Sequence, residues 1–313
     1  MIDVTMLGTA ATMPLPGRAL TSVYLAYNGR AILFDCGEGT QTAARKAGVS
    51  LMKIDLIALT HFHGDHIFGL PGMLQSMGCL GRTAPLYVIG PKGLGAALKP
   101  VLALSGPMPF PIYALPLPEK QDSGAFSVAD YIAGWPFEAY VEFFRTDHRV
   151  ESLGYKFSLS RPGKFSAQNA TALGVPQNQW GILQHGEAVS LESGAVIEPG
   201  DVLGPPRRGL SIVVSGDTSP CDSLKKASQD ADLLICDATY GSPDMSSQDD
   251  KYGHSTFYED AVLAKECNVR NLWLTHFSQM MEDPDEYLPN ASDVFPNAVC
   301  AEDGMTITLN FDE

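Results

Sequence analysis

The stretch THFHGDH at residues 60–66 constrains this chain more than any other part of its sequence. It holds three histidines and an aspartate within six positions, a density that neither a hydrophobic core nor an ordinary surface requires. The glycine inside it permits a sharp turn, so His61 and His63 can face one metal ion while Asp65 and His66 face a second. Imidazole and carboxylate ligands favour Zn²⁺, with Mn²⁺ or Fe²⁺ as alternatives. The stretch therefore predicts a metal site.

Further candidate ligands follow predicted strands. Apolar runs rich in β-branched residues predict strands at 2–7, 22–27, 31–34, 54–59, 86–89, 140–145, 155–159, 211–214, 233–236 and 271–274. Ligand sites gather where strand ends meet loops, and His148, Asp217 and His276 each follow one of these strands. Two metal ions about 3.5–4 Å apart need a bridging ligand, and the carboxylate of Asp217 is the natural candidate.

Helical patterns alternate with these strands and complete the predicted architecture. We expect helices at 37–47, 66–77, 93–104, 166–173 and 256–267, the last with a capping box from Thr256 to Glu259. Residues 105–138 are rich in proline and glycine and receive no assignment. The two halves of strands and helices predict an α/β fold of two facing sheets with helices outside. We expect one domain over 1–313, with an inserted arm at 160–209 that projects from it.

Composition limits the possible partners and compartments. The 313 residues carry a formal net charge of −15, so a polyanion would need a local positive patch or a bound cation. The six cysteines form no CxxC pair and are expected to be free thiols in a reducing compartment. The N-terminus lacks the pattern of a secretion signal, and no long apolar run predicts a membrane span. We therefore expect a cytoplasmic protein without a membrane partner.

Several further motifs resemble one family. The segments LGTAATMPLPGRALTS, FDCGEGTQ, DHRVESLGYKF, VSGDTSPC, GHST and THFS are similar, in this order, to those of ribonuclease Z, a branch of the metallo-β-lactamase superfamily that trims the 3′ end of precursor tRNA. The resemblance implies the αββα sandwich, two zinc ions per subunit and a homodimer whose arm clamps the tRNA. It also implies hydrolysis of an RNA phosphodiester by a hydroxide that bridges the metals.

The resemblance assigns roles residue by residue. It implies one zinc ion on His61, His63 and His148, a second on Asp65, His66 and His276, and Asp217 as the bridge. His254 of GHST would be the additional catalytic histidine near the scissile phosphate, and Asp65 would also accept the proton of the attacking water. Four residues are expected to support a ligand or to contact substrate, namely Asp35, Asp237, Ser278 and Arg18, although a solvated loop charge is an equal interpretation for Arg18.

Three departures from the family pattern concern RNA binding and the catalytic histidine. The arm has neither Lys nor Arg between Pro176 and Gly194, which would weaken contacts with RNA phosphates. The residues after Ser278 lack the family's arginine. Asp237 replaces a glutamate and is one methylene shorter, so we expect a looser hydrogen bond to His254. Trp180 in the arm either packs its small core, the favoured interpretation, or stacks on a base.

Three functions are compatible with these motifs and departures. The first is a zinc-dependent endoribonuclease of the ribonuclease Z type acting on precursor tRNA. The second is a dizinc hydrolase of the same fold that acts on small phosphodiesters, cyclic nucleotides or sulfate esters, which the lysine-poor arm favours. The third is a metal-bound protein that binds RNA without turnover, and the complete ligand set argues against it.

Overall fold

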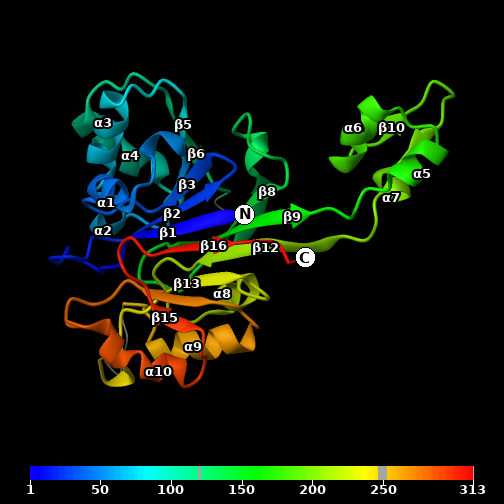
Figure 1. Ribbon diagram of the computed structural model, residues 1–313. Helices are drawn as coiled ribbons and strands as arrows, with labels where there is room; N and C mark the ends of the chain where they lie inside the picture. The colour runs from blue at the N-terminus through cyan, green and yellow to red at the C-terminus, as the bar shows by residue number, and fades with distance from the viewer. Residues whose placement is uncertain (119–120, 246–251, 313) are drawn as a thin grey trace.

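Two seven-stranded mixed sheets face each other at the centre of the molecule (Figure 1) in a computed structural model that describes residues 1–118, 121–245 and 252–312. The first sheet has the spatial order β16 (Thr306–Leu309), β1 (Ile2–Gly8), β2 (Ser22–Tyr27), β3 (Arg30–Phe34), β4 (Ile54–Ala58), β5 (Leu86–Gly90) and β6 (Ile112–Pro116). The second has the order β15 (Ala298–Cys300), β14 (Leu272–Thr275), β13 (Leu233–Asp237), β12 (Arg207–Val214), β9 (Leu153–Arg161), β8 (Ala139–Arg145) and β7 (Ser123–Ser127).

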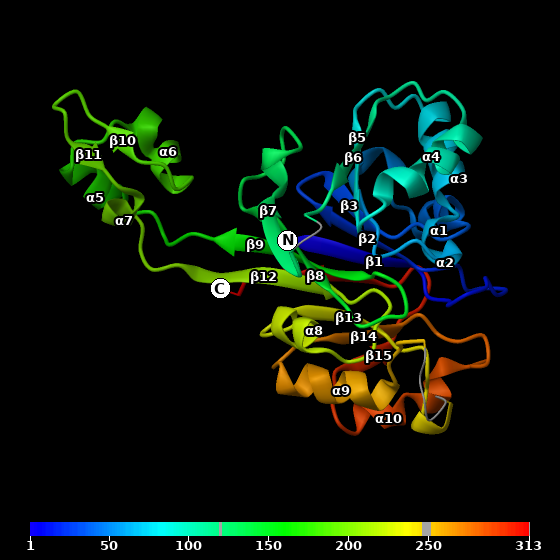
Figure 2. The ribbon, with the colours of Figure 1, turned by 180° about the vertical axis from the view of Figure 1, so that it is seen from behind.

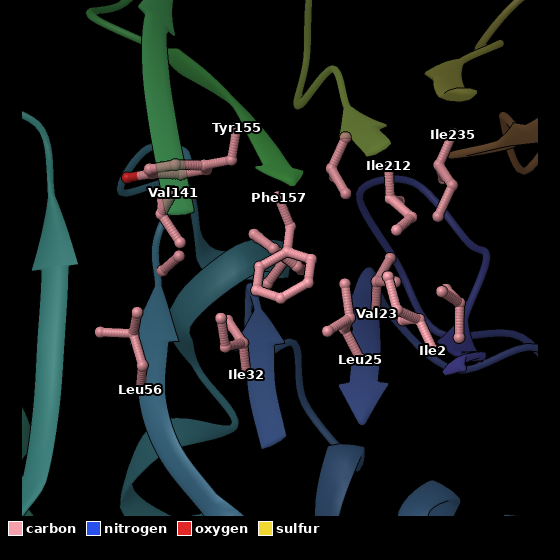
Figure 3. Packing of buried hydrophobic residues seen from close by; sticks show 14 of the residues in the cluster. Ile2, Val23, Leu25, Ile32, Leu56, Val141, Tyr155, Phe157, Ile212 and Ile235 are labelled. Atoms are coloured by element: carbon pink, nitrogen blue, oxygen red, sulfur yellow. The ribbon is translucent and has the colours of Figure 1, made fainter. Parts of the chain in front are cut away.

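The main hydrophobic core fills the space between the sheets. Figure 3 shows Leu25 and Ile32 of the first sheet pointing toward Phe157 and Ile212 of the second. All four side chains are almost completely buried. Burial of a large aliphatic or aromatic side chain stabilises a fold by about 1.5–3 kcal/mol, so this layer holds the two halves of the chain together.

Helices cover the outer face of each sheet. A second apolar cluster joins the first sheet to α1 (Thr40–Ala47), α3 (Leu70–Cys79) and α4 (Leu94–Ser105). A third joins the second sheet to α8 (Asp222–Ala227), α9 (Phe257–Glu266) and α10 (Pro289–Ser292). The arrangement is the predicted αββα sandwich, and the capping box of Thr256 with Glu259 at the start of α9 is confirmed. None of the described helices is long and apolar enough to cross a membrane.

Two expectations for local structure were wrong in their boundaries. The helix expected at 66–77 is two helices, α2 (Gly64–Ile67) and α3, because the chain bends where the backbone of Gly69 packs directly on that of Gly37. The helix expected from residue 37 begins at Thr40, after Gly39 with a φ of 87°. The sequence analysis also made no assignment for β6, β7, β15 and β16, which the structure adds to the sheet edges.

The segment between β9 and β12 projects away from the sandwich (Figures 1 and 2). It contains α5 (Ala167–Ala172), α6 (Trp180–Gln184), β10 (Val189–Ser190), β11 (Val196–Ile197) and α7 (Pro199–Val202). Its apolar side chains form a separate small cluster. Trp180 packs against this cluster and donates its indole N–H to the carbonyl of Val175 at 3.0 Å, so the packing interpretation of Trp180 holds.

Short 3₁₀ turns complete the described secondary structure. They lie at Leu51–Lys53, Val128–Asp130, Gln177–Gln179, Pro243–Met245 and Pro284–Tyr287.

Candidate metal centre

The ends of several strands bring the predicted ligands to one edge of the sandwich. The loop after β4 carries His61 and His63, and α2 follows directly with Asp65 and His66. Loops after β8, β12 and β14 supply the remaining three ligands, His148, Asp217 and His276. All seven predicted ligands therefore meet between the two sheets. They belong to three groups of potential ligand atoms, namely His61, His63, His148 and Asp217; Asp65, His66 and His276; and Asp217, His254 and His276.

The first group consists of three histidines and one oxygen of Asp217, with one ligand atom from each residue within 4.8 Å of the others. Nε2 of His61 lies 2.8 Å from Nδ1 of His63, and Nε2 of His148 lies 3.5 Å from the same Nδ1. Oδ2 of Asp217 completes the group, 3.6 Å from Nε2 of His61 and 4.0 Å from Nε2 of His148.

The second group consists of Asp65, His66 and His276, and both of its histidines face the other oxygen of Asp217. Its Oδ1 lies 3.2 Å from Nε2 of His66 and 3.4 Å from Nε2 of His276. Oδ2 of Asp65 faces the same place, 3.4 Å from Nε2 of His276. Because each oxygen of Asp217 faces a different group, its carboxylate has the position that a ligand shared between two cations requires.

Hydrogen bonds behind the ligands fix the orientation of the rings. Asp35 accepts from the backbone N–H of Thr60 and pairs with Nδ1 of His66, both at 2.8 Å. It follows β3 with a φ of 56°, a strained conformation for a residue with a side chain. Asp35 thus turns Nε2 of His66 toward the site, which is the supporting position expected for it.

The other rings have comparable partners. Nδ1 of His148 faces the carbonyl of Gly253 at 3.0 Å, and Nδ1 of His276 pairs with the hydroxyl of Thr239 at 2.9 Å. A Cβ at residue 253 would come too close to the backbone of His148. The backbone and one threonine therefore direct both Nε2 atoms inward.

The charge distribution of the site favours a cation. Burial disfavours the charged form of His276, but the carboxylates of Asp217 and Asp237 outweigh it and raise its pKa to about 10. Burial likewise opposes ionisation of Asp217, yet His276 and His66 hold its pKa well below the usual value. The carboxylates are thus ionised and favour protons on His66 and His276, and a divalent cation would supply the same positive charge in place of those protons.

The donor set also fits a metal ion in its geometry. Among the described residues, Nε2 of His66 and Nε2 of His276 are buried without a hydrogen-bond partner. Buried polar atoms are rarely left unpaired, and both of these atoms converge on the oxygens of Asp65 and Asp217. Imidazole nitrogens and carboxylate oxygens together are the ligands of zinc and similar divalent ions.

His254 belongs with Asp217 and His276 to a third group of potential ligand atoms, and it is held by Asp237. Its Nδ1 lies 2.6 Å from Oδ2 of Asp237, and its ring stacks on that of His276 with the centroids 5.4 Å apart. The expectation of a looser bond from the shorter Asp237 was wrong. Amides of the chain hold this carboxylate, with Thr218 N–H and Thr239 N–H each 3.0 Å from one of its oxygens, so it reaches the imidazole.

Comparison with known proteins connects this centre to a family. Residues 16–130 match the model of the metallo-beta-lactamase superfamily. The chain is 41% identical over its full length, and over all of the relative, to ribonuclease Z of Agathobacter rectalis, and 40% identical to that of Clostridioides difficile with the same coverage. The chain belongs to the ribonuclease Z family. It is therefore a metal-dependent hydrolase, of the endoribonuclease class.

A solved member of the ribonuclease Z family agrees with this assignment. The short form of human tRNase Z has 28% sequence identity and a TM-score of 0.66, and the match covers 99% of this chain and all of that one. The crystal structure of YhfI from Bacillus subtilis aligns with a TM-score of 0.67 over 98% of both chains, but at 19% identity it supports the fold alone.

Two residues that the sequence suggested for ligand support or substrate contact, Arg18 and Ser278, hold backbone segments instead. Arg18 donates to the carbonyls of Met281 at 3.2 Å and Glu282 at 2.8 Å, so its guanidinium anchors the loop after β14. Ser278 lies in the same loop, and its N–H faces the carbonyl of Thr239 at 3.4 Å. The contacts of both residues thus lie in the loop that begins with His276 and in its surroundings.

Sequence reasoning missed three residues that support the centre. Thr60 stands inside the opening motif, so its position gave a signal that went unused. Thr239, which contacts both His254 and His276, follows a strand without any recognisable pattern. Arg149, beside His148, approaches His63 to 3.4 Å. The position of an arginine next to a predicted ligand was the available signal.

Proposed function

We propose that this protein is a zinc-dependent endoribonuclease that removes the 3′ trailer from precursor tRNA. The observation that carries the proposal is the shared carboxylate of Asp217, whose two oxygens face the two groups of histidines. The names of the relatives support the substrate, since ribonuclease Z and human tRNase Z match the chain along its whole length. The net charge of −15 makes local positive charge necessary for RNA to dock, and bound cations supply it.

Two zinc ions are the proposed cofactors, one on each ligand group. His61, His63 and His148 would hold the first, and Asp65, His66 and His276 the second, with Asp217 shared. When bound, such ions lower the pKa of water and offset the negative charge that develops on phosphate oxygens. Mn²⁺ or Fe²⁺ would suit the same nitrogen and oxygen atoms.

The residues of the chain supply proton transfer and orientation. The pKa of Asp65 lies well below its ordinary value, because the hydrogen bond and positive charge of His276 and the charge of His66 outweigh its burial. Asp65 is thus ionised at neutral pH and able to accept a proton from the attacking water. Its position is fixed by the backbone N–H of Thr12, which donates to Oδ2 at 2.7 Å.

His254 is the proposed general acid. Burial disfavours its charged form, but the carboxylate of Asp237 outweighs burial and raises its pKa. With Nδ1 bound to Asp237, Nε2 is the nitrogen that can give a proton to the leaving oxygen. Cleavage in this way leaves a 3′-hydroxyl and a 5′-phosphate.

One pair of assays tests the proposal. The zinc-loaded protein is incubated with precursor tRNA carrying a 3′ trailer and, separately, with bis(p-nitrophenyl) phosphate. We expect a single cut after the discriminator base, loss of this activity with a chelator, and recovery when zinc is added back. Turnover of the small diester without cleavage of the precursor would reject tRNA processing and favour the alternative substrate class.

That alternative is a hydrolase of small phosphodiesters, and one observation favours it. The outer part of the arm, from Pro176 to Gly194, has no Lys or Arg, whereas it has Glu187 and Glu192. The cations of the arm, Arg161, Lys164, Arg207 and Arg208, all lie near its base. Because its positive charges lie at its base, the arm would contact RNA phosphates there and not at its tip. A small phosphodiester needs no contact with the tip.

We also propose a cytoplasmic homodimer, as the family resemblance implies. Exposed apolar side chains support a partner surface on the helical side of the first sheet, where Phe68, Leu80 and Leu104 are each more than half exposed. The monomer has a mass of 33.6 kDa. Light scattering should give twice this mass for the purified protein, and a monomeric mass at all concentrations would reject the dimer.

A further inference from the structure

Arg149 occupies the rim of the metal centre. It follows His148 in the loop after β8 and is exposed to solvent. Its Nη2 lies 3.4 Å from Nε2 of His63, and its guanidinium lies over the ring of Tyr252, 5.4 Å from the centroid. The aromatic ring holds the cation by attraction to its π face, so Arg149 has a defined place at the mouth of the site.

When a metal ion is bound, Nε2 of His63 can no longer accept a hydrogen bond from the guanidinium of Arg149. Nδ1 of His63 faces Nε2 of His61 and Nε2 of His148, so it is the nitrogen directed at the ligand group. A histidine that gives one ring nitrogen to a metal carries its proton on the other. Nε2 of His63 then becomes a donor, and a guanidinium has no acceptor.

Two donors that face each other across 3.4 Å require an acceptor between or beside them. The acceptor must tolerate the positive charge of Arg149, and the residues that the structure describes provide no such group beside it. Among the residues that the structure describes, Arg149 has no carboxylate partner, although other exposed arginines such as Arg270 do. A phosphate oxygen has the negative charge and the lone pairs that both donors require.

We infer that Arg149 and the imidazole N–H of His63 together bind a phosphate of the substrate backbone at the entrance to the metal centre. The inference rests on the proposed function, since it names a contact for that substrate. A guanidinium matches phosphate with two parallel hydrogen bonds. Arg18, the other cation that the sequence suggested for substrate contact, is unsuited to this role, because both of its terminal nitrogens donate to backbone carbonyls.

The test measures phosphate binding separately from turnover. The probe is precursor tRNA whose cleavage junction is a methylene phosphonate, which keeps the charge and resists hydrolysis. For Arg149→Gln in the zinc-loaded protein, we expect Kd to rise about 10- to 100-fold, as for loss of a hydrogen bond to a charged group. The slope of log Kd against log salt should fall by about 0.7, which corresponds to one phosphate contact in a single strand.

Two variants serve as controls. Lys99→Gln removes the same unit charge from an exposed position on α4 and should leave the salt slope and Kd close to those of the wild type. Arg149→Lys keeps the charge but loses the planar fork, so it should restore the salt slope while affinity stays below that of the wild type. Zinc content should be the same in all variants.

Two results would overturn the inference. One is a Kd and a salt slope for Arg149→Gln that equal those of Lys99→Gln. The other is loss of zinc from Arg149→Gln, which would mean that the arginine merely positions His63. If the wild type hydrolyses only bis(p-nitrophenyl) phosphate, tRNA processing fails but this inference does not. Arg149→Gln should then still raise KM for the diester while kcat is retained, and an unchanged KM would reject it.

Discussion

At the scale of single residues, the five proposed ligand histidines and His254 can be compared by what their second ring nitrogen contacts. Nδ1 of His148 faces a backbone carbonyl, and Nδ1 of His276 faces a threonine hydroxyl. Nδ1 of His254 is instead bound to the ionised Asp237. A carboxylate partner stabilises the imidazolium and therefore suits proton donation. Nδ1 of the proposed ligand His66 has the same kind of partner in Asp35, at 2.8 Å, so the separation of acid from ligand requires a measurement.

Replacing His254 tests this separation. His254→Ala should reduce the rate of precursor cleavage by about 10²- to 10⁴-fold, the usual contribution of a general acid, and should leave zinc content unchanged. Zinc is measured by atomic absorption and the rate in single-turnover assays. His185→Ala is the matched control, because this exposed histidine contacts Phe137 and no residue of the centre. Parallel loss of zinc and rate would instead make His254 a ligand.

A second residue of interest is the buried Asp260 on α9. Its side chain is fully buried, Oδ1 accepts from the thiol of Cys236 at 3.1 Å, and Oδ2 has no described hydrogen-bond partner. Burial raises the pKa of Asp260 well above its usual value of 3.8. The carboxyl group is therefore protonated in the folded protein over a range where it ionises in the unfolded chain.

The sign of the resulting pH dependence follows directly. An acid whose pKa is raised by folding contributes stability that is complete below about pH 3.8 and is lost as the pH rises toward the folded pKa. Asp260→Asn cannot ionise, so its free energy of unfolding relative to the wild type should increase with pH by up to about 1.4 kcal/mol per unit. Urea unfolding between pH 4 and about pH 7 measures this, and a constant difference would refute it.

At the scale of elements, the break between α2 and α3 shapes the metal centre. Gly69 packs its backbone on that of Gly37, and the amide of Gly69 donates to the carbonyl of Cys36 at 2.9 Å. These contacts join α2, with Asp65 and His66, to the loop that carries Asp35. The glycine is thus required by close backbone approach rather than by a positive φ.

Substitution at this break should disturb both stability and metal binding. The Cβ of Gly69→Ala would overlap the carbonyl of Gly37, and such overpacking costs about 1–3 kcal/mol or more of unfolding free energy. The same change at Gly95, inside α4, meets nothing within 4 Å and should raise stability by about 0.5–1 kcal/mol. Denaturant unfolding compares the two, with zinc affinity as a second measurement. Equal effects at both positions would contradict the packing argument.

At the scale of the whole molecule, the arm is a separate packing unit. Its cluster of Ala170, Val175, Leu183, Val189, Ile197 and Val202 is distinct from the three clusters of the sandwich. The strands at its base are paired, with Arg161 opposite Arg207. A short turn could therefore join these two strands in place of the arm. Removal of the arm should therefore leave the sandwich and its centre in place.

Replacement of residues 163–205 by a short Gly/Ser turn tests this independence. Because distant sites contribute additively, kcat/KM for bis(p-nitrophenyl) phosphate should stay within about twofold of the wild type. The melting temperature should shift by less than about 4 °C, which corresponds to roughly 1 kcal/mol in a domain of this kind. Loss of diester hydrolysis in a folded protein would mean that the arm helps to shape the centre.

The sequence by itself determined the fold class and which residues could bind metal. His61, His63, Asp65 and His66 are four candidate ligands in one short motif, so their proximity needed no tertiary information. Strands such as β2 and β4 were predictable because the alternation and the runs of apolar residues are local properties. Asp35 was predicted as a support from its motif alone.

Only the tertiary structure decided how distant segments meet. β16 pairs with β1 so that Leu309 lies opposite Ile2, and nothing in either segment specifies the other. The approach of Arg149 to His63 and the division of the oxygens of Asp217 between two groups have the same origin. Such contacts depend on how the sheets pack against each other, and packing is a property of the whole chain that no local pattern encodes.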